Sequence, residues 1–206
     1  MATTWLALLS PVVRADLFDD VLTAANQNDT EQLLGYLRKG IAPDTSDIDG
    51  NTLLISAARQ GNETVVDELI LRGAKVRSRN RFGDDALMVA AFKGALPVVK
   101  MLVSAGAELN RDEGWTALIY AAFNGHVETM EYLIAQGADV DADSDNGTTA
   151  LMVAARNGHE EAVKLLLKHE ADPNDENQAG GTALRWALAA GHTTIADILR
   201  AAGARD

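Results

Sequence analysis

The chain has 206 residues, of which 30 are acidic and 18 are basic, so its formal net charge at pH 7 is −12. A surface that binds nucleic acid needs net positive charge, and this balance therefore argues against a nucleic-acid partner. The sequence contains no cysteine, which excludes disulfides, thiolate zinc sites and cysteine nucleophiles. It also contains no run of about 18 apolar residues, so it predicts no membrane span.

Residues 1–15 do not follow the pattern of the rest of the chain. An apolar stretch over residues 5–9 is followed by Pro11 and then by Ala15, an order that is typical of a secretory signal cleaved after a small residue. Only the α-amino group places positive charge ahead of the apolar stretch, whereas such signals usually begin with basic residues. Two expectations follow: an exported, periplasmic protein that begins at Asp16, and a cytoplasmic protein in which this segment caps a stack of repeats.

A sequence unit recurs over residues 16–206, at a spacing of 33 residues that falls once to 31. The units share Thr or Asp, then Leu two residues on, a pair of small or apolar residues that begins with alanine, a glycine, and an apolar stretch; the first unit is degenerate, with Val21 and Asn28 in place of the leucine and the glycine. A period of this length predicts supersecondary units that stack into one array and bury a core between neighbours. About six units fit the chain, over residues 16–48, 49–81, 82–112, 113–145, 146–178 and 179–206.

Each unit predicts two helices. The Thr or Asp can cap the first helix by accepting a hydrogen bond from an unpaired backbone N–H. A glycine ends this helix, because glycine takes the left-handed conformation without strain. The second helix has apolar residues at i, i+3 and i+4, which predicts one buried face. The expected caps are Thr52, Asp85, Thr116, Thr149 and Thr182, and the expected terminators are Gly61, Gly94, Gly125, Gly158 and Gly191.

Two places depart from the repeat. Glu170 stands where other units have the glycine after the second helix, and a left-handed backbone there would cost about 1 kcal/mol. The segment from Gly106 to Thr116 is two residues shorter than the matching segments of the neighbouring units. The finger that leads to Trp115 is therefore expected to be short.

The motifs Gly-x-Thr-x-Leu, Ala-Ala-x-x-Gly-His and Leu-Leu/Ile-x-x-Gly-Ala resemble the ankyrin repeat over roughly nine-tenths of the chain. The resemblance implies an all-α solenoid with short β-hairpin fingers. It also implies a non-catalytic adaptor or chaperone, monomeric on its own, that holds a partner protein on its concave face. If residues 1–15 are a signal, the chain resembles small exported ankyrin proteins of bacteria, some associated with catalase function or with the neutralisation of secreted toxins.

No motif predicts catalysis or a cofactor, and we expect no metal. Aspartates alternate from Asp139 to Asp145, but an EF-hand loop starting at Asp141 would need glycine and glutamate where Asn146 and Met152 stand. A solvated acidic hairpin is the favoured interpretation. A carrier of calcium or haem remains the alternative function. The histidines at equivalent repeat positions are too far apart to share a metal, and we expect them to bridge adjacent repeats: His126, His159 and His192.

Aromatic and arginine residues occupy positions that the repeat framework leaves variable: the finger tip, the residue after it, and the positions around the Ala pair. Such residues are the usual anchors of protein interfaces. The alternative is that Phe92 and Phe123 only pack between the first helices of adjacent repeats. The predicted partner-binding residues are Arg59, Arg81, Phe82, Phe92, Lys93, Trp115, Tyr120, Phe123, Arg156 and Trp186.

Charge is also segregated along the sequence. Residues 72–81 hold five basic residues and no acid, whereas residues 139–145 and 172–176 hold acids and no base. Such polarity can steer and orient a charged partner. The alternative is two solvated faces without a binding role.

Overall fold

The computed structural model describes residues 11–111 and 113–205, with side chains described from Leu17 onward. The described part of the chain forms twelve α-helices and contains no β-strand, which confirms the all-α prediction. The helices are α1 (Pro11–Asn26), α2 (Thr30–Arg38), α3 (Leu53–Gln60), α4 (Glu63–Leu71), α5 (Ala86–Lys93), α6 (Leu96–Ser104), α7 (Ala117–Phe123), α8 (Val127–Ala135), α9 (Ala150–Arg156), α10 (Glu160–Lys168), α11 (Ala183–Ala189) and α12 (Thr193–Ala201).

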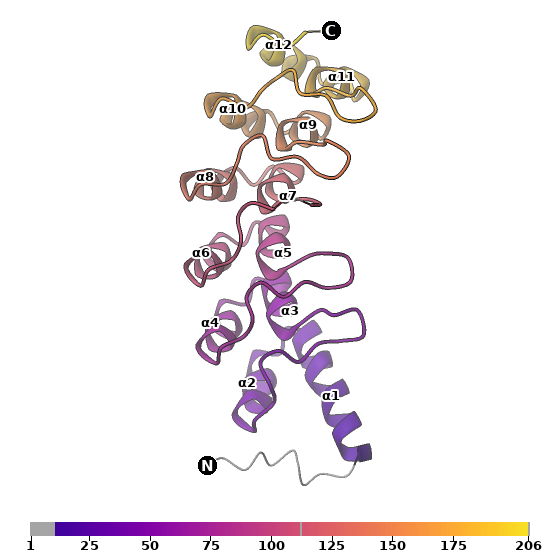
Figure 1. Ribbon diagram of the computed structural model, residues 1–206. Helices are drawn as coiled ribbons and strands as arrows, with labels where there is room; N and C mark the ends of the chain where they lie inside the picture. The colour runs from indigo at the N-terminus through magenta and orange to yellow at the C-terminus, as the bar shows by residue number, and fades with distance from the viewer. Residues whose placement is uncertain (1–10, 112, 206) are drawn as a thin grey trace. The chain divides into compact units, whose positions relative to one another are not determined.

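The helices belong to two compact units. The first contains the chain up to Ala90 together with Pro97–Ala107, and the second contains Ala91–Leu96 and the chain from Glu108 onward. In the first unit, α1 packs on α3 and α2 packs on α4 (Figure 1). In the second unit, α7, α9 and α11 form one row of neighbours, and α8, α10 and α12 form another. The repeat pattern did not predict a division at this place.

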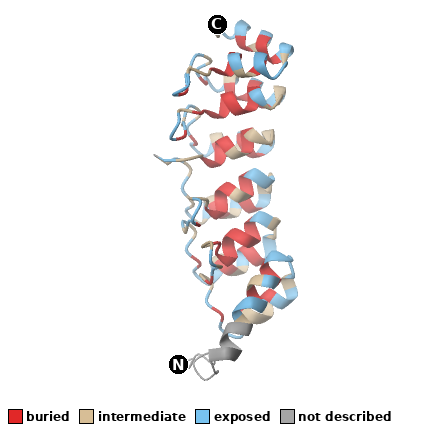
Figure 2. Ribbon diagram, turned by 90° about the vertical axis from the view of Figure 1, so that its right-hand side faces the viewer, coloured by how far each residue is buried: buried red, intermediate tan, exposed pale blue. Residues whose placement is uncertain are grey.

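The core of each unit consists of alanine and aliphatic side chains between the two rows of helices. On α7, for example, the buried side chains are small or branched, and Ala121 and Ala122 are fully buried. Buried residues lie on the inner faces of the helices, and exposed residues follow the outer faces and loops (Figure 2). Because alanine keeps the helix axes close, this core needs no aromatic side chain.

The expected caps of the first helices are confirmed. The hydroxyl of Thr116 accepts a hydrogen bond of 3.3 Å from the N–H of Ile119, and Asp85 accepts one of 3.0 Å from Met88 in the same way. These bonds pair one of the N–H groups that a helix start leaves open. The same contact occurs at Thr52, Thr149 and Thr182.

Three of the helix-ending glycines, Gly94, Gly125 and Gly158, have two reasons to be glycine. Gly125 has a φ of 69°, and the other four expected terminators also have positive φ. A Cβ atom added to Gly125 would lie 2.6 Å from Nδ1 of His159, and one added to Gly94 would lie 2.6 Å from Nδ1 of His126. The glycine therefore relieves backbone strain and leaves room for the imidazole of the following repeat.

The histidines bridge adjacent repeats, as the sequence predicts. Nε2 of His126 lies 3.0 Å from the carbonyl oxygen of Phe92, and Nε2 of His159 lies 2.9 Å from that of Phe123. A carbonyl oxygen only accepts, so the Nε2–H group donates. His192 makes the same contact with the carbonyl of Arg156, at 3.1 Å. Each bond fixes the second helix of one repeat to the end of the first helix of the repeat before it.

The expected β-hairpin fingers are not confirmed as strands. The described residues contain two isolated antiparallel bridges, Ser46 with Thr52 and Asp143 with Thr149. Four fingers instead end in a turn closed by glycine, as where the N–H of Gly147 donates to the carbonyl of Ser144 at 2.7 Å. A side chain at the start of each turn accepts further N–H groups, so the finger closes without a ladder. In the described residues of the shorter segment before α7, no turn of this kind is found.

Three local predictions can be compared directly with the backbone. Glu170 has a φ of 67°, so the left-handed conformation predicted there is confirmed. Arg200, expected to face water at the end of the array, is exposed and lies 3.5 Å from Asp197. Helix α1 runs without a break from Pro11 to Asn26 and so crosses the predicted boundary at Ala15, while residues 1–10 lie outside the described part.

Replacing Glu170 by glycine should stabilise the second unit. We expect Glu170→Gly to raise the free energy of unfolding by up to about 1 kcal/mol, because glycine has no left-handed penalty. The matched control is Gly137→Ala, where φ is 97° and a Cβ atom would meet nothing within 4 Å. That change should lower stability by a similar amount. Urea unfolding measures both, and two unchanged midpoints would contradict the strain at this position.

Asp175 should make stability depend on pH. Burial raises the pKa of its carboxyl, and the charges of Asp141, Asp172 and Asp143 raise it further. Ionised Asp175 therefore destabilises the fold above the folded-state pKa, and this cost disappears as pH falls towards the ordinary value of 3.8. We expect Asp175→Asn to raise the unfolding midpoint at pH 7 and to lose that advantage in acid. Asp197→Asn, which removes an exposed partner of Arg200, should not stabilise; equal gains from both would refute the assignment.

Candidate protein-binding surface

Four aromatic side chains of the second unit form one cluster. Phe92 lies at the end of α5, Trp115 just before α7, and Tyr120 and Phe123 on α7. The ring of Phe92 stacks on that of Phe123 with centroids 6.2 Å apart and meets Tyr120 edge-on at 5.9 Å. Trp115 closes the group, at 5.1 Å from Tyr120 and 5.6 Å from Phe123. The structure thus brings together four of the residues that the sequence singled out. We call them the four-ring cluster.

The four-ring cluster lies outside the apolar core. The side chain of Phe92 is 46% exposed, and the other three rings are half-buried. Phe92 and Phe123 do stack between repeats, as the alternative interpretation expected, yet both keep exposed surface. Their carbonyl groups are held as well, because Asn124 and Asn157 donate to them at 2.7 Å beside the two histidine bonds. The cluster is therefore a fixed, partly exposed aromatic surface.

An acidic finger adjoins the four-ring cluster. The N–H of Gly114, the residue before Trp115, donates to Oδ1 of Asp145 at 2.7 Å. On the same finger, the N–H of Asp139 donates to Oδ1 of Asn110 at 2.8 Å. The carboxylates of this finger are exposed, and no basic side chain among the described residues pairs with them: Asp139, Asp141, Asp143 and Asp145.

Arg156 and Trp186 form a second, separate pair in the same unit. The guanidinium of Arg156 lies 5.4 Å from the ring centroid of Trp186, and the two line a shallow groove of about 370 Å³ with Ala189 and Ala190. Trp186 rests on the backbone of Gly181, where an added Cβ atom would lie 2.5 Å from Nε1. Within the described residues, no ring contact joins Trp186 to the four-ring cluster.

The remaining predicted residues of the first unit have their own partners. Phe82 is 66% exposed at a finger tip, with the guanidinium of Arg81 at 4.8 Å from its ring centroid. Arg81 also pairs with Asp49 at 2.9 Å. Arg59 donates to Oδ1 of Asn51 at 2.9 Å. Lys93, at the end of α5, belongs to the second unit and is exposed.

The basic segment 72–81 is less charged than its sequence suggests. Arg72 pairs with Glu68, and Lys75 with Asp44 at 3.6 Å, in addition to the pairing of Arg81. Asp44 belongs to the preceding repeat and Asp49 lies 32 residues before Arg81, so a local sequence window does not reveal these two acids. The carboxylate of Asp47 is likewise bound within the finger, by hydrogen bonds from Asp49 and Asn51. Burial alone would raise its pKa, but hydrogen bonds from Asn51 and Asp49 and the positive charge of Arg59 hold it below the ordinary value.

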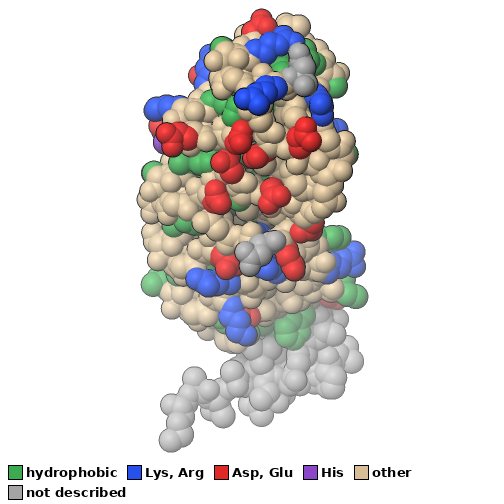
Figure 3. Space-filling model, turned by 45° about the horizontal axis from the view of Figure 1, so that its top comes forward, with side chains coloured by type: hydrophobic (Ala, Val, Ile, Leu, Met, Phe, Trp, Pro, Cys, Tyr) green, Lys and Arg blue, Asp and Glu red, His purple; other side chains and the backbone are tan. Residues whose placement is uncertain are grey.

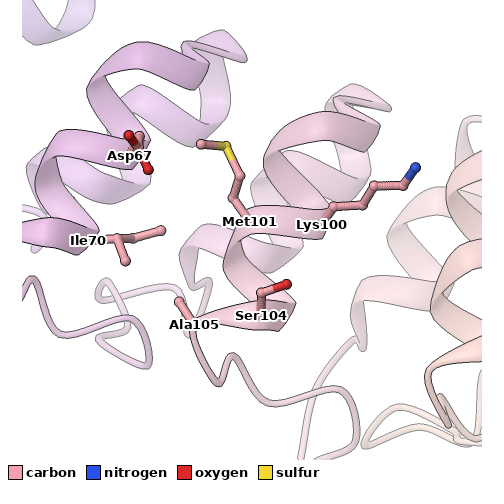
Figure 4. Close-up of a pocket in the computed structure, with 6 residues that line it drawn as sticks. All are labelled: Asp67, Ile70, Lys100, Met101, Ser104 and Ala105. Carbon is pink, nitrogen blue, oxygen red and sulfur yellow. The ribbon is translucent and has the colours of Figure 1, made fainter.

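The sequence did not predict an open groove of about 430 Å³ between α4 and α6 of the first unit. Figure 4 shows Ile70 and Met101 lining it, with Lys100 pointing away from Asp67. No acid and base therefore face each other across the groove, and none of the predicted binding residues lies in it.

Among the described residues, no group of three His, Asp or Glu is placed to hold a metal ion. None of the described helices is long and apolar enough to cross a membrane.

Parts of the chain are similar to curated proteins of several kinds. It is 36% identical over 86 residues to the B-cell lymphoma 3 protein homolog of Mus musculus, covering 41% of this chain and 19% of that protein. It is 40% identical over 65 residues to the mitochondrial disaggregase of Bos taurus, covering 32% and 10%. It is 36% identical over 84 residues to serine/threonine-protein kinase 12 of Arabidopsis thaliana, covering 41% and 18%. The matches thus span less than a fifth of each relative.

The family model described as ankyrin repeats, in three copies, matches residues 21–112, 63–144, 107–177 and 136–205. These overlapping matches cover nearly all of the repeats described above. They agree with the Thr caps, the paired helices and the histidine bridges of the structure. The chain belongs to the ankyrin-repeat family.

Proposed function

We propose that this protein is a non-catalytic adaptor or chaperone that holds a partner protein on the four-ring cluster. Ankyrin repeats generally mediate protein–protein interactions and are typically non-catalytic. The observation that carries the proposal is the position of Phe92, Trp115, Tyr120 and Phe123, which are clustered, partly exposed and outside a core that alanine and aliphatic residues complete.

The cluster has the properties of an interface anchor. Large rings bury much surface area and have few rotatable bonds. Here the backbone of Phe92 and Phe123 is already held by hydrogen bonds, so binding a partner costs little further conformational entropy. The rings occupy the positions after the finger and around the Ala pair, which in ankyrin arrays belong to the concave side. The pair Arg156 and Trp186 would extend the contact within the same unit. We further propose that the protein is monomeric until it meets its partner.

Partner binding is better supported than the carrier function. A haem carrier would need a histidine nitrogen free to bind iron, but Nε2 of His126, His159 and His192 each donates to a carbonyl. The fourth histidine, His169, is exposed at the end of α10, away from the four-ring cluster in the sequence. Nδ1 of His126 lies against Gly94. A calcium site would need converging ligands, and none is found in the described residues. Neutralising a toxin, or supporting a catalase, would be special cases of protein binding.

Shortening a ring of the cluster should weaken the complex. After affinity purification from the host has identified the partner, we expect Trp115→Ala to weaken binding by about 2 kcal/mol, roughly thirtyfold. Calorimetry on the purified pair measures this, and thermal unfolding should change little, because Trp115 lies outside the core. Asp143→Ala should mainly alter the salt dependence. Normal binding by Trp115→Ala, or an unfolded variant, would show that the rings only pack.

We also propose that the protein is exported. The support is the order of residues in 1–15, an apolar stretch followed by a small residue at Ala15. Mass spectrometry of the protein from its own host should then find Asp16 as its first residue. An intact start at Met1 would instead place the protein in the cytoplasm, with helix α1 retained whole.

A further inference from the structure

The four-ring cluster and the acidic finger form one continuous surface. Oδ1 of Asp145 is bound by the N–H of Gly114, next to Trp115, so this carboxylate lies at the edge of the rings. Asp139, Asp141 and Asp143 follow it along the exposed finger without basic partners in the described residues. Figure 3 shows acidic side chains gathered on one face of the molecule with few basic ones among them. The rings therefore have a mainly negative neighbour, although the guanidinium of Arg111 lies close to Gly114.

Rings and carboxylates attract the same kind of group. The face of an aromatic ring carries negative electrostatic potential, and it attracts an ammonium or a guanidinium within about 6 Å of the centroid. Exposed carboxylates that repel one another gain from the approach of a cation and would repel phosphate or an acidic peptide. A purely apolar partner would bury the rings but gain nothing from the finger.

The structure already contains contacts between a guanidinium and an aromatic ring. Arg156 and Trp186, in adjacent repeats, stand at the repeat positions of Phe92 and Tyr120, and their side chains form a cation–π pair at 5.4 Å. On the first unit, Arg81 lies over Phe82 in a similar way, at 4.8 Å. The backbone geometry at these positions thus allows a guanidinium to lie on an aromatic ring.

We propose that the partner segment bound by the four-ring cluster is basic, with an arginine or lysine side chain lying on the rings and its charge facing Asp143 and Asp145. The inference rests on the proposed function and specifies its partner. The segment comes from a different protein rather than from a second copy of this chain. The chain's own basic segment is already engaged, because Arg72, Lys75 and Arg81 pair with acids and Arg77 donates to the carbonyl of Gly106.

The test uses two fluorescent peptides that differ only in charge. One is a glycine–serine peptide with two arginines, and the other has citrulline, the uncharged isostere, in place of both. Fluorescence anisotropy with the full chain should show binding of the arginine peptide at low salt, with at least tenfold weaker binding of the citrulline peptide. Equal affinity for both, or no binding of the arginine peptide, overturns the proposal.

Variants of the chain separate this site from general attraction to an acidic protein. The double variant Asp143→Asn with Asp145→Asn should weaken arginine-peptide binding about tenfold, the effect of 1.4 kcal/mol, and asparagine keeps an oxygen for the N–H of Gly114. The matched control, Glu128→Gln with Glu131→Gln on α8, removes the same charge from an exposed helix face and should leave binding unchanged. Phe123→Leu, which keeps apolar bulk but removes the ring face, should weaken binding too. An equal loss in the control overturns the proposal.

The natural partner distinguishes failure of this inference from failure of the proposed function. If Trp115→Ala weakens the natural complex while the aspartate double variant does not, the surface binds a partner but not through a basic segment. If neither change affects the complex, the proposed function itself fails. Loss of binding in both variants, with unfolding midpoints unchanged, supports both proposals.

Discussion

The contact of a histidine with the preceding repeat sets the spacing between adjacent repeats in the second unit. The imidazole of His159 lies against Gly125 and donates to the carbonyl of Phe123, and His126 makes the same two contacts with Gly94 and Phe92. One side chain thus fixes both the distance and the rotation between two repeats. Because the accepting carbonyls belong to Phe92 and Phe123, the bonds that hold the stack also hold the backbone of two rings of the candidate site.

Stability and binding depend on different residues in this unit. The core is closed by alanine, leucine and isoleucine, and the rings add contacts at its outer edge. Beside the acidic finger, Asp175 lowers stability when it is ionised, because burial and the charges of Asp141, Asp172 and Asp143 raise the pKa of its carboxyl. Glu170 stores backbone strain close by in the sequence. Folding alone does not require these features, and the carboxylates would gain from a cationic partner. This separation of stabilising residues from binding residues is typical of a surface whose charge repulsion and backbone strain are offset when a partner binds.

Local rules repeated along the chain explain why much of the fold could be predicted. A threonine cap and a left-handed glycine depend on a few neighbouring residues, and the bridging histidine recurs at one position of successive repeats, so the sequence indicates all three directly. Contacts that join distant residues and do not recur along the chain were harder to predict. The acids that pair with Lys75 and Arg81 lie about 30 residues earlier in the chain, and the groove between α4 and α6 has no motif of its own. The four rings were predicted as a set, but their mutual contacts and the role of Asp145 required the structure.

The finger before α7 is two residues shorter than its neighbours, and this difference places a carboxylate beside the four-ring cluster. Where two longer fingers meet, their tips join through the backbone: the N–H of Gln178 donates to the carbonyl of Asn146, and the N–H of Arg81 donates to that of Asp49. The shorter finger joins its neighbour differently, and the N–H of Gly114 takes the side chain of Asp145 instead. A deletion thus exchanges a backbone acceptor for a carboxylate beside Trp115. The chemistry of this surface arises from a change in loop length as much as from the residues placed on it.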